Sequence, residues 1–317
     1  MSKTGKFVVS LDFELIWGVF DHVVPEEKEV YFNNTRQLIP KLLAIFAENK
    51  IQVTWATVGM LANENWEEWL SHIPVEKPTY VNSKFDAYAF GLEQLKSKKT
   101  TSFFAPDLIT SIVQTPYQEL ATHTYSHYYC LEAGQTESQF QTDLQLACKL
   151  TEKWNIQPKS LVFPRNQYNE GYLTVCKKIG ITNVRTNPDC WYWQENSIPT
   201  MAKKIARTAD AYINLGRKDY PVSVLTEEGG VQLQPASRFL RPYSSKFGLH
   251  DLHLKRVEQE MTLAAKNGSI YHLWWHPHNF GNHPEQSLHY LSKIIKLYHK
   301  LNQEYGFESH SMSNVGH

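Results

Sequence analysis

Three stretches of the chain begin with apolar residues and end in polar ones. In the first, the odd-numbered residues are all apolar, whereas the even-numbered residues become polar toward the end, which is the alternation of a strand with two different faces. The second ends in two histidines, and the third is an apolar run followed by two more. These stretches are 7–15, 120–127 and 269–278. We interpret each as a buried strand that brings polar side chains to its C-terminal end.

The rest of the chain alternates between helical and extended patterns. Apolar residues at helical spacing predict helices at 35–49, 136–154, 169–179, 201–214, 252–267 and 284–305. Short apolar runs predict further strands at 51–58, 117–123, 160–163, 181–185, 222–226 and 307–312. This alternation favours an α/β fold with parallel strands. With about seven strand–helix units, we expect a closed or nearly closed barrel rather than an open sheet.

Residues 63–116 interrupt this regularity. They include four prolines and show no clear periodicity, so we expect short helices and loops there. Segments of this length without regular structure are uncommon unless they have a function, and this one is expected to shape a substrate cleft. No linker or internal repeat divides the chain, which predicts a single domain over residues 1–317 with this segment as an insertion.

Composition and charge exclude several functions. The 317 residues include 32 basic and 32 acidic side chains, and this balance gives no electrostatic case for binding nucleic acid or an anionic membrane. No apolar run is long enough to span a bilayer. The N-terminus lacks the pattern of a signal peptide, and the four cysteines form no C-x-x-C pair, so we expect a soluble protein of the cytoplasm.

Two pairs of side chains suggest a metal site. Asp12 and Glu14 lie two residues apart on a strand, so they point the same way about 7 Å apart, and two buried like charges need a metal ion or an arginine nearby. His123 and His127 have the spacing that places both imidazoles on one face of a helix, where they suit one metal ion. The same features also fit a strand that has simply reached solvent and a chance pair among fourteen histidines.

Three further groups carry weaker signals. Arg165 follows a predicted strand and could pair with a strand-end carboxylate, although a surface arginine fits equally well. His276 or His278 could donate a proton to a leaving group, whereas a lone histidine is more often a core residue. Arg238 and Arg241 could bind a phosphate or carboxylate, and tryptophans such as Trp191 could stack on sugar rings, but surface arginines and core packing are ordinary alternatives.

In this order, the stretches resemble the polysaccharide deacetylase family, which are metal-dependent carbohydrate esterases with a distorted (β/α)7 barrel. The family has five motifs. Four of them have clear counterparts here, and the remaining one, the fourth in chain order, has only a loose counterpart. The matching residues are Asp12 and Glu14, His123 and His127, Phe163-Pro164-Arg165, Asp189-Cys190-Trp191 (loosely) and His276. The chain departs from the family where Phe13 separates the carboxylates, where Glu14 replaces an aspartate, and where Asn166 follows Arg165 in place of the usual residues.

The resemblance implies a site and a reaction. Glu14, His123 and His127 would hold one divalent ion, expected to be zinc. Asp12, held by Arg165, would act as base, and His276 would act as acid with His278 competing for that role. A backbone N–H near Tyr128 would stabilise the oxyanion. The remaining expected substrate contacts are Asn166, Trp191, His278, Arg238 and Arg241. The expected reaction removes an N-acetyl or other short acyl group from an amino sugar, or from a sugar conjugate, for a surface polysaccharide.

Other functions remain open at this point. A deformylase, or a hydrolase of a non-sugar amide, would use the same residues. A metal-free carbohydrate-binding protein descended from such an enzyme is a third possibility, although the complete set of carboxylates and histidines argues against it. A glycosidase is disfavoured because two carboxylates on one strand are poorly placed to flank a glycosidic bond from opposite sides.

Overall fold

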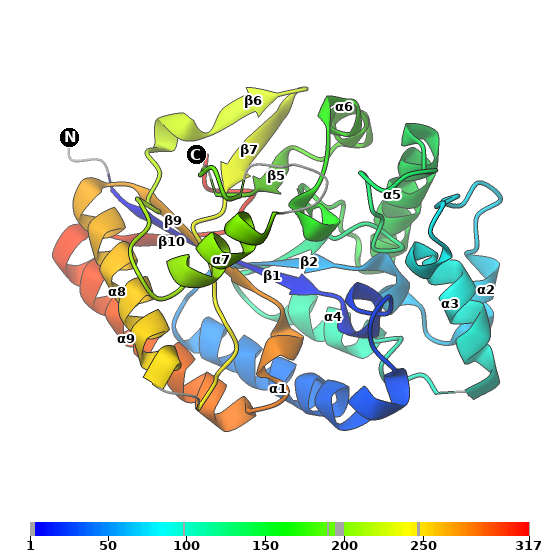
Figure 1. Ribbon diagram of the computed structural model, residues 1–317, viewed down its shortest axis with the longest axis horizontal. Coiled ribbons are helices and arrows are strands. Elements are labelled where there is room, and N and C mark those ends of the chain that lie inside the picture. Colours follow the sequence, from blue (N-terminus) through cyan, green and yellow to red (C-terminus); the bar gives the residue numbers. More distant parts are fainter. Residues whose placement is uncertain (1–3, 98, 189, 194–199, 246–247, 317) are drawn as a thin grey trace.

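A single curled sheet runs through the molecule, and its longest strand in the described part of the chain is β1, Lys6–Phe13 (Figure 1). The computed structural model describes residues 4–316 except 98, 189, 194–199 and 246–247. The other strands in this part of the chain are β2 Val53–Thr57, β3 Gln118–Thr122, β4 Ser160–Val162, β5 Asn183–Thr186, β6 Thr226–Glu228, β7 Val231–Pro235, β8 Arg238–Phe239, β9 Ile270–Trp275 and β10 Glu308–His310. Their order is β6-β7-β5-β4-β3-β2-β1-β9-β8, and β10 pairs with the start of β1.

The pairings confirm a parallel α/β barrel and show where it is open. All of them are parallel except that of β6 with β7. Among the described residues no pairing joins β8 to β7, so the sheet is curled like a barrel but is not closed on that side. The predicted (β/α)7 type of fold is therefore confirmed. The barrel is open between the two ends of the strand order, β6-β7 at one end and β8 at the other.

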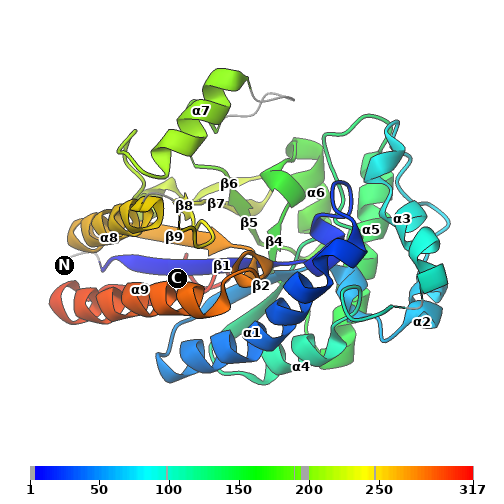
Figure 2. The ribbon, with the colours of Figure 1, turned by 60° about the horizontal axis from the view of Figure 1, so that its bottom comes forward.

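Most helices lie on the outside of the sheet, whereas the helix Met201–Asp210 projects away from it (Figure 2). The helices are α1 Glu29–Glu48, α2 Trp66–Ser71, α3 Ala87–Gln94, α4 Pro106–Gln114, α5 Glu137–Thr151, α6 Glu170–Ile179, α7 Met201–Asp210, α8 Leu249–Asn267 and α9 Pro284–Tyr305. Helix α8 packs on α9, α1 on α4 and α9, and α5 on α6. None of the helices in the described part of the chain is long and apolar enough to cross a membrane.

The two faces of β1 have different surroundings, as the alternation of the sequence predicts. Its odd-numbered residues, Phe7 to Phe13, pack into the largest hydrophobic core between the sheet and the helices. On the other face, Val8 packs with Ala56 of β2 and Val162 of β4 in a small apolar cluster inside the curl of the sheet. Farther along this inner face the strand becomes polar. The barrel is thus filled at one end and leaves room for chemistry at the other.

Some elements differ from the expectation. Helix α9 has the predicted bounds, and Thr136 forms the capping box with Gln139 that begins α5. Strands β7 and β8 were not predicted, because β7 is short and half polar and β8 has only two residues. Residues 222–226 were expected to be extended, but Val222–Val224 forms a 3-10 turn before β6. Residues 63–116 contain α2, α3 and α4.

Candidate metal centre

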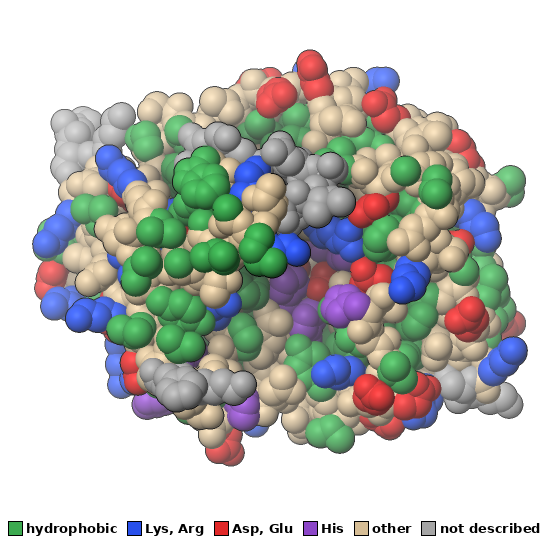
Figure 3. Space-filling view, viewed as in Figure 1, with side chains coloured by type: hydrophobic (Ala, Val, Ile, Leu, Met, Phe, Trp, Pro, Cys, Tyr) green, Lys and Arg blue, Asp and Glu red, His purple; other side chains and the backbone are tan. Residues whose placement is uncertain are grey.

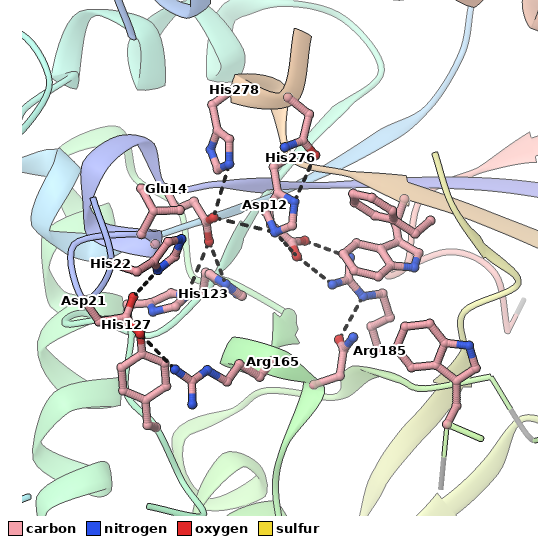
Figure 4. A pocket seen from close by; sticks show the side chains of 18 residues that line it. Asp12, Glu14, Asp21, His22, His123, His127, Arg165, Arg185, His276 and His278 are labelled. Atoms are coloured by element: carbon pink, nitrogen blue, oxygen red, sulfur yellow. Dashed lines mark hydrogen bonds and ion pairs between the residues drawn. The ribbon is translucent and has the colours of Figure 1, made fainter. Parts of the chain in front are cut away.

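Polar side chains from three strand ends converge on one cavity at the C-terminal edge of the sheet (Figure 4). They come from β1, from the loop after β3 and from the turn after β9, which are the three stretches that the sequence pattern singled out. The cavity has a volume of about 460 Å³. Figure 3 shows it as a hollow in the surface where histidine and acidic side chains are visible.

Glu14 is placed between two histidines in a way that fits a bound cation. Its Oε2 atom lies 3.3 Å from Nε2 of both His123 and His127, and all three side chains are buried. Nδ1–H of His123 donates to the carbonyl oxygen of Val162 at 2.7 Å, so Nε2 of the neutral ring carries a lone pair. A lone pair that faces a carboxylate oxygen is stable only with a proton or cation between them. Among the described residues Glu14 Oε2 has no hydrogen-bond partner.

These three residues therefore fit a divalent metal ion. Together they form one of the clusters of histidine and carboxylate side chains that could hold a metal ion in the described part of the chain. Two histidines and one carboxylate are the protein ligands of several hydrolytic zinc sites, which keep a further position open. Burial raises the pKa of Glu14, but the neighbouring histidines, above all His276, hold it well below its usual value. The carboxylate is thus ionised and ready to bind a cation.

A buried aspartate shapes the loop that carries both histidines. Asp143 of α5 accepts hydrogen bonds from the backbone N–H groups of Tyr125 and Ser126, at 2.7 and 3.1 Å, and from the Ser126 hydroxyl. His127 has a φ of 55°, in the left-handed region. The prediction that His123 and His127 share a helical face is wrong: they lie on a tight loop, and its turns bring the two rings to within 5.0 Å.

Gly18 makes room for the Glu14 carboxylate. A methyl group on Gly18 would overlap that carboxylate, although the backbone at Gly18 has no positive φ and accepts alanine. We expect Gly18→Ala to fold normally but to bind metal at least about tenfold more weakly, because one of three ligands is displaced. Metal titration by calorimetry measures this.

Gly171→Ala is the matched control for that prediction. A methyl group at Gly171 would overlap the carboxylate of Glu137, which is exposed and can move away. This variant should bind metal as the unchanged protein does. If Gly18→Ala and Gly171→Ala bind metal equally well, the position of the Glu14 carboxylate does not determine metal affinity.

Asp12 is held by Arg185 of β5, and not by Arg165. The two terminal nitrogens of Arg185 donate to the two oxygens of Asp12, each at 2.7 Å, and Nη1 also donates to the Ser10 hydroxyl at 2.9 Å. The guanidinium lies 4.2 Å from the ring centroid of Trp274. Burial raises the pKa of Asp12, but Arg185 first, then His123 and His276, bring it below its ordinary value. Asp12 is therefore an ionised carboxylate in a fixed orientation.

Arg165 lies elsewhere in the cavity wall. It pairs with Glu132 at 2.7 Å and with Asp21 at 3.0 Å, and its guanidinium lies over the ring of Tyr129. The expectation that it holds Asp12 is wrong, because its two carboxylate partners lie at the rim. Arg185 was missed. The sequence did offer one signal for Arg185, which is an arginine near the end of an apolar strand. A buried charge of this kind needs a partner, but the sequence does not show which residue that partner is.

The two histidines after β9 have different surroundings. His276 lines the cavity with 24% of its side chain exposed, and its Nε2 lies 3.7 Å from Asp12 Oδ2 and 3.6 Å from Glu14 Oε1. Its Nδ1 is 3.2 Å from the side-chain oxygen of Asn279, which fixes the ring. His278 is buried, and its burial, with the charge of His276, lowers its pKa to about 3. Of the two, His276 is the one that the cavity exposes to a substrate.

Two of the residues expected to contact the substrate bind other parts of the protein instead. Tyr128 donates its backbone N–H to the Thr124 hydroxyl at 2.8 Å and its own hydroxyl to Gln135, so neither group is available to a substrate. The oxyanion role of another backbone N–H near it stays a prediction. Arg238 is buried in a two-pronged ion pair with Glu260, with both contacts at 2.6 Å. Its predicted substrate role is wrong because both prongs of its guanidinium bind Glu260.

The other expected contacts divide between the cavity and the outside. Asn166 lies in the cavity wall, where it accepts a hydrogen bond from Arg185 Nε at 3.2 Å. Arg241 lies over the ring of Tyr212, outside the residues that line the cavity. Trp191 is 57% exposed and also lies outside the lining. The substrate contacts of Arg241 and Trp191 stay predictions. Trp193 and Trp274 line the cavity instead. Asp189, from the loosely matched motif, lies outside the described residues.

Comparison with known families identifies the class of protein. The model of the polysaccharide deacetylase family matches residues 3–184, which is more than half of the chain. The chain therefore belongs to the polysaccharide deacetylase family, and this membership supports a hydrolase that deacetylates carbohydrates. A comparison with curated protein sequences finds no match.

Solved structures show the same fold at low sequence identity. A protein from Mycobacterium smegmatis assigned as a polysaccharide deacetylase has a TM-score of 0.62 and 14% identity, covering 100% of this chain and 90% of that one. One from Pseudomonas aeruginosa PAO1, assigned likewise, has a TM-score of 0.59 and 10% identity, with coverages of 98% and 89%. Puue allantoinase has a TM-score of 0.58 and 12% identity, with coverages of 98% and 88%. At such identities the likeness concerns the fold alone.

Proposed function

We propose that this protein is a metal-dependent N-deacetylase of an amino sugar or a sugar conjugate. The observation that carries the proposal is Glu14 Oε2, which is buried between two histidine nitrogens at 3.3 Å and has no hydrogen-bond partner among the described residues. A cation bound between these atoms would stabilise this arrangement. The family to which the chain belongs supplies the reaction class. Glu14, His123 and His127 are the proposed ligands, and zinc is the proposed ion.

The residues around this site have distinct proposed roles. A divalent ion held there would lower the pKa of a water molecule and polarise an acyl carbonyl. Asp12 would take a proton from the attacking water, and the Arg185 guanidinium keeps its carboxylate in place. The oxygen of the water adds to the acyl carbon. His276 then gives a proton to the nitrogen as the C–N bond breaks, so that an amine and a short carboxylic acid leave.

The cavity wall suits a sugar. Trp193, Phe239 and Trp274 place aromatic rings along it, and flat apolar faces of this kind pack well on sugar rings. We place the substrate in the synthesis or modification of a surface polysaccharide, as a free, nucleotide-linked or lipid-linked sugar. A cytoplasmic location is part of the proposal, and it is supported by the four free cysteines, three of them buried.

A different amide is the second candidate. Puue allantoinase shares this fold, and its name denotes an enzyme that acts on a compound other than a sugar. A deformylase or another amide hydrolase would use Asp12, Glu14 and the same histidines. A screen that measures acid release from N-acetyl sugars, N-formyl sugars and non-sugar amides separates these functions. A metal-free carbohydrate-binding protein would release no acid from any of them.

The metal content of the purified chain tests the proposal. We expect about one divalent ion per chain by inductively coupled plasma mass spectrometry, and its loss in His127→Ala. His22→Ala is the matched control, because His22 lies at the same cavity but its ring is 63% exposed and pairs with Asp21. That variant should keep the ion. If the unchanged protein takes up no ion after incubation with zinc or cobalt, the hydrolytic mechanism is wrong.

A further inference from the structure

Helix α7 turns its apolar side toward solvent. Met201 is 72% exposed and Ile205, one turn later, is 61% exposed, whereas the acidic residue Asp210 is buried. A surface helix of a globular protein ordinarily buries its apolar stripe and exposes its charges. Figure 2 shows that α7 also projects away from the body of the molecule. The helix thus presents apolar side chains at a point that stands out from the rest of the surface.

The polar side of α7 is committed to the fold, so the helix cannot simply rotate to bury its apolar side. Arg207 donates through Nε to the carbonyl oxygen of Tyr192 at 2.7 Å, and its guanidinium lies 4.4 Å from the ring centroid of Trp193. Asp210 lies 3.5 Å from Lys218 and 3.4 Å from Arg238. These contacts hold the outward orientation of Met201 and Ile205.

More apolar side chains are exposed on the segments that flank α7. Trp191 is 57% exposed, Ile213 is 55% exposed and Leu215 is 39% exposed. Figure 3 shows hydrophobic side chains gathered over α7 beside the cavity. Single exposed apolar residues are normal, but a group of them with a polar border marks an interaction surface. We call these five residues, Trp191, Met201, Ile205, Ile213 and Leu215, the apolar face.

The charges near the apolar face are basic. Helix α7 carries Lys203, Lys204 and Arg207, and its one acidic residue, Asp210, is buried in ion pairs. Lys204 is exposed next to Ile205. A helix with exposed aliphatic residues on one side and lysines beside them is the pattern of segments that lie in the headgroup region of a bilayer, and Trp191 on the preceding segment adds an aromatic side chain that suits this region. Anionic headgroups would complement the exposed Lys204, whereas Arg207 already binds Tyr192 and Trp193.

We propose that the apolar face of α7 docks the protein on the surface of an anionic lipid bilayer. A second copy of the chain fits less well, because a stable protein interface takes about 20–30 residues on each side and α7 offers a narrow projecting ridge. A projecting helix, by contrast, reaches a bilayer before the rest of the surface and inserts its side chains by about 5–10 Å.

Docking through α7 would place the cavity at the bilayer. Trp193 lines the cavity and is stacked by Arg207 of α7, so the docking helix and the cavity wall are in direct contact. A sugar carried on a lipid would then be presented where the cavity opens. This consequence rests on the proposed function, whereas the docking itself does not.

Sedimentation with lipid vesicles tests the docking without any turnover. The protein is mixed with vesicles of equal parts phosphatidylglycerol and phosphatidylcholine, and with vesicles of phosphatidylcholine alone. We expect it to sediment with the first and much less with the second. The double variant Met201→Gln with Ile205→Gln should lower the partition by at least about tenfold, because two apolar side chains no longer leave water. Lys204→Glu should weaken binding to the anionic vesicles.

The double variant Val75→Gln with Val81→Gln is the matched control. Both valines are highly exposed, at 106% and 80%, and they belong to the 63–116 segment rather than to α7. This variant should bind vesicles as the unchanged protein does. No binding to anionic vesicles, or equal binding after the α7 substitutions, would overturn the proposal. So would a dimer, detected by light scattering, that the α7 variant converts to a monomer. Because metal content and acid release are measured separately, failure here leaves the proposed chemistry unaffected.

Discussion

Replacing Arg185 with alanine is expected to lower the free energy of unfolding by about 3–5 kcal/mol and to abolish hydrolysis. The substitution leaves the Asp12 carboxylate buried without its two charge-assisted hydrogen bonds, each 2.7 Å long. A buried unpaired charge costs several kcal/mol, and the carboxylate lowers that cost by taking up a proton. Protonated Asp12 cannot accept a proton from water. Urea unfolding and acid release from an N-acetylated sugar measure the two effects.

Arg165→Ala is the matched control. Arg165 lines the same cavity, but it pairs with Asp21 and Glu132 at the rim, and its side chain is 37% exposed. Ion pairs of this exposure contribute about 0–1 kcal/mol, so the variant should remain nearly as stable as the unchanged protein. If Arg185→Ala does not fold, Arg185→Lys keeps the charge without the planar fork and should fold with reduced activity. A larger loss of activity in Arg165→Ala than in Arg185→Lys would reverse the assignment.

Replacing His276 with glutamine is expected to lower the rate of amide hydrolysis by about 10²–10⁴, which is the range for loss of a general acid. An amine leaves only when its nitrogen receives a proton, and His276 is the histidine that the cavity exposes beside Asp12. An acetate ester with a good leaving group needs no such proton. The same variant should therefore lose much less activity on 4-nitrophenyl acetate than on the amide, and the part that it does lose reflects the contact of His276 with Glu14 at 3.6 Å.

His278→Gln separates the two histidines. His278 is buried and its pKa is lowered to about 3, so its ring is neutral near pH 7 and is poorly suited to give up a proton. We expect its replacement to reduce amide and ester hydrolysis alike, through the contact of the ring with Glu14 at 3.8 Å. A loss confined to the amide substrate in His278→Gln, and absent in His276→Gln, would assign the acid role to His278.

The sequence predicted those parts of the site that depend on local spacing. The alternation along β1 placed Asp12 and Glu14 on one face, and the polar ends of three strands were expected to meet, because parallel strands end at the same edge. The partner of Asp12 was assigned wrongly. Arg165 and Arg185 both follow or end short strands, and only the curvature of the sheet decides which arginine points inward.

Other errors have the same physical origin. Arg238 lies on a strand of two residues, too short to be recognised, and its ion pair with Glu260 joins residues that are 22 positions apart. Helix α7 was expected, but an amphipathic pattern shows only that a helix has two sides and not which side is covered. The zero net charge likewise averages over the whole chain and does not reveal three basic residues on one projecting helix.

Asp143 has a consequence for how the site would respond to loss of its ion. Its carboxylate receives two backbone N–H groups and one hydroxyl from the loop before His127, so the loop is fastened to α5 by the protein itself. In small zinc domains the ion orders the chain, and ion binding and folding are one event. Here the protein's own hydrogen bonds also hold the loop that carries the two histidines. We therefore expect the fold to survive removal of the ion, and the bound ion to add its binding free energy to the stability of the scaffold.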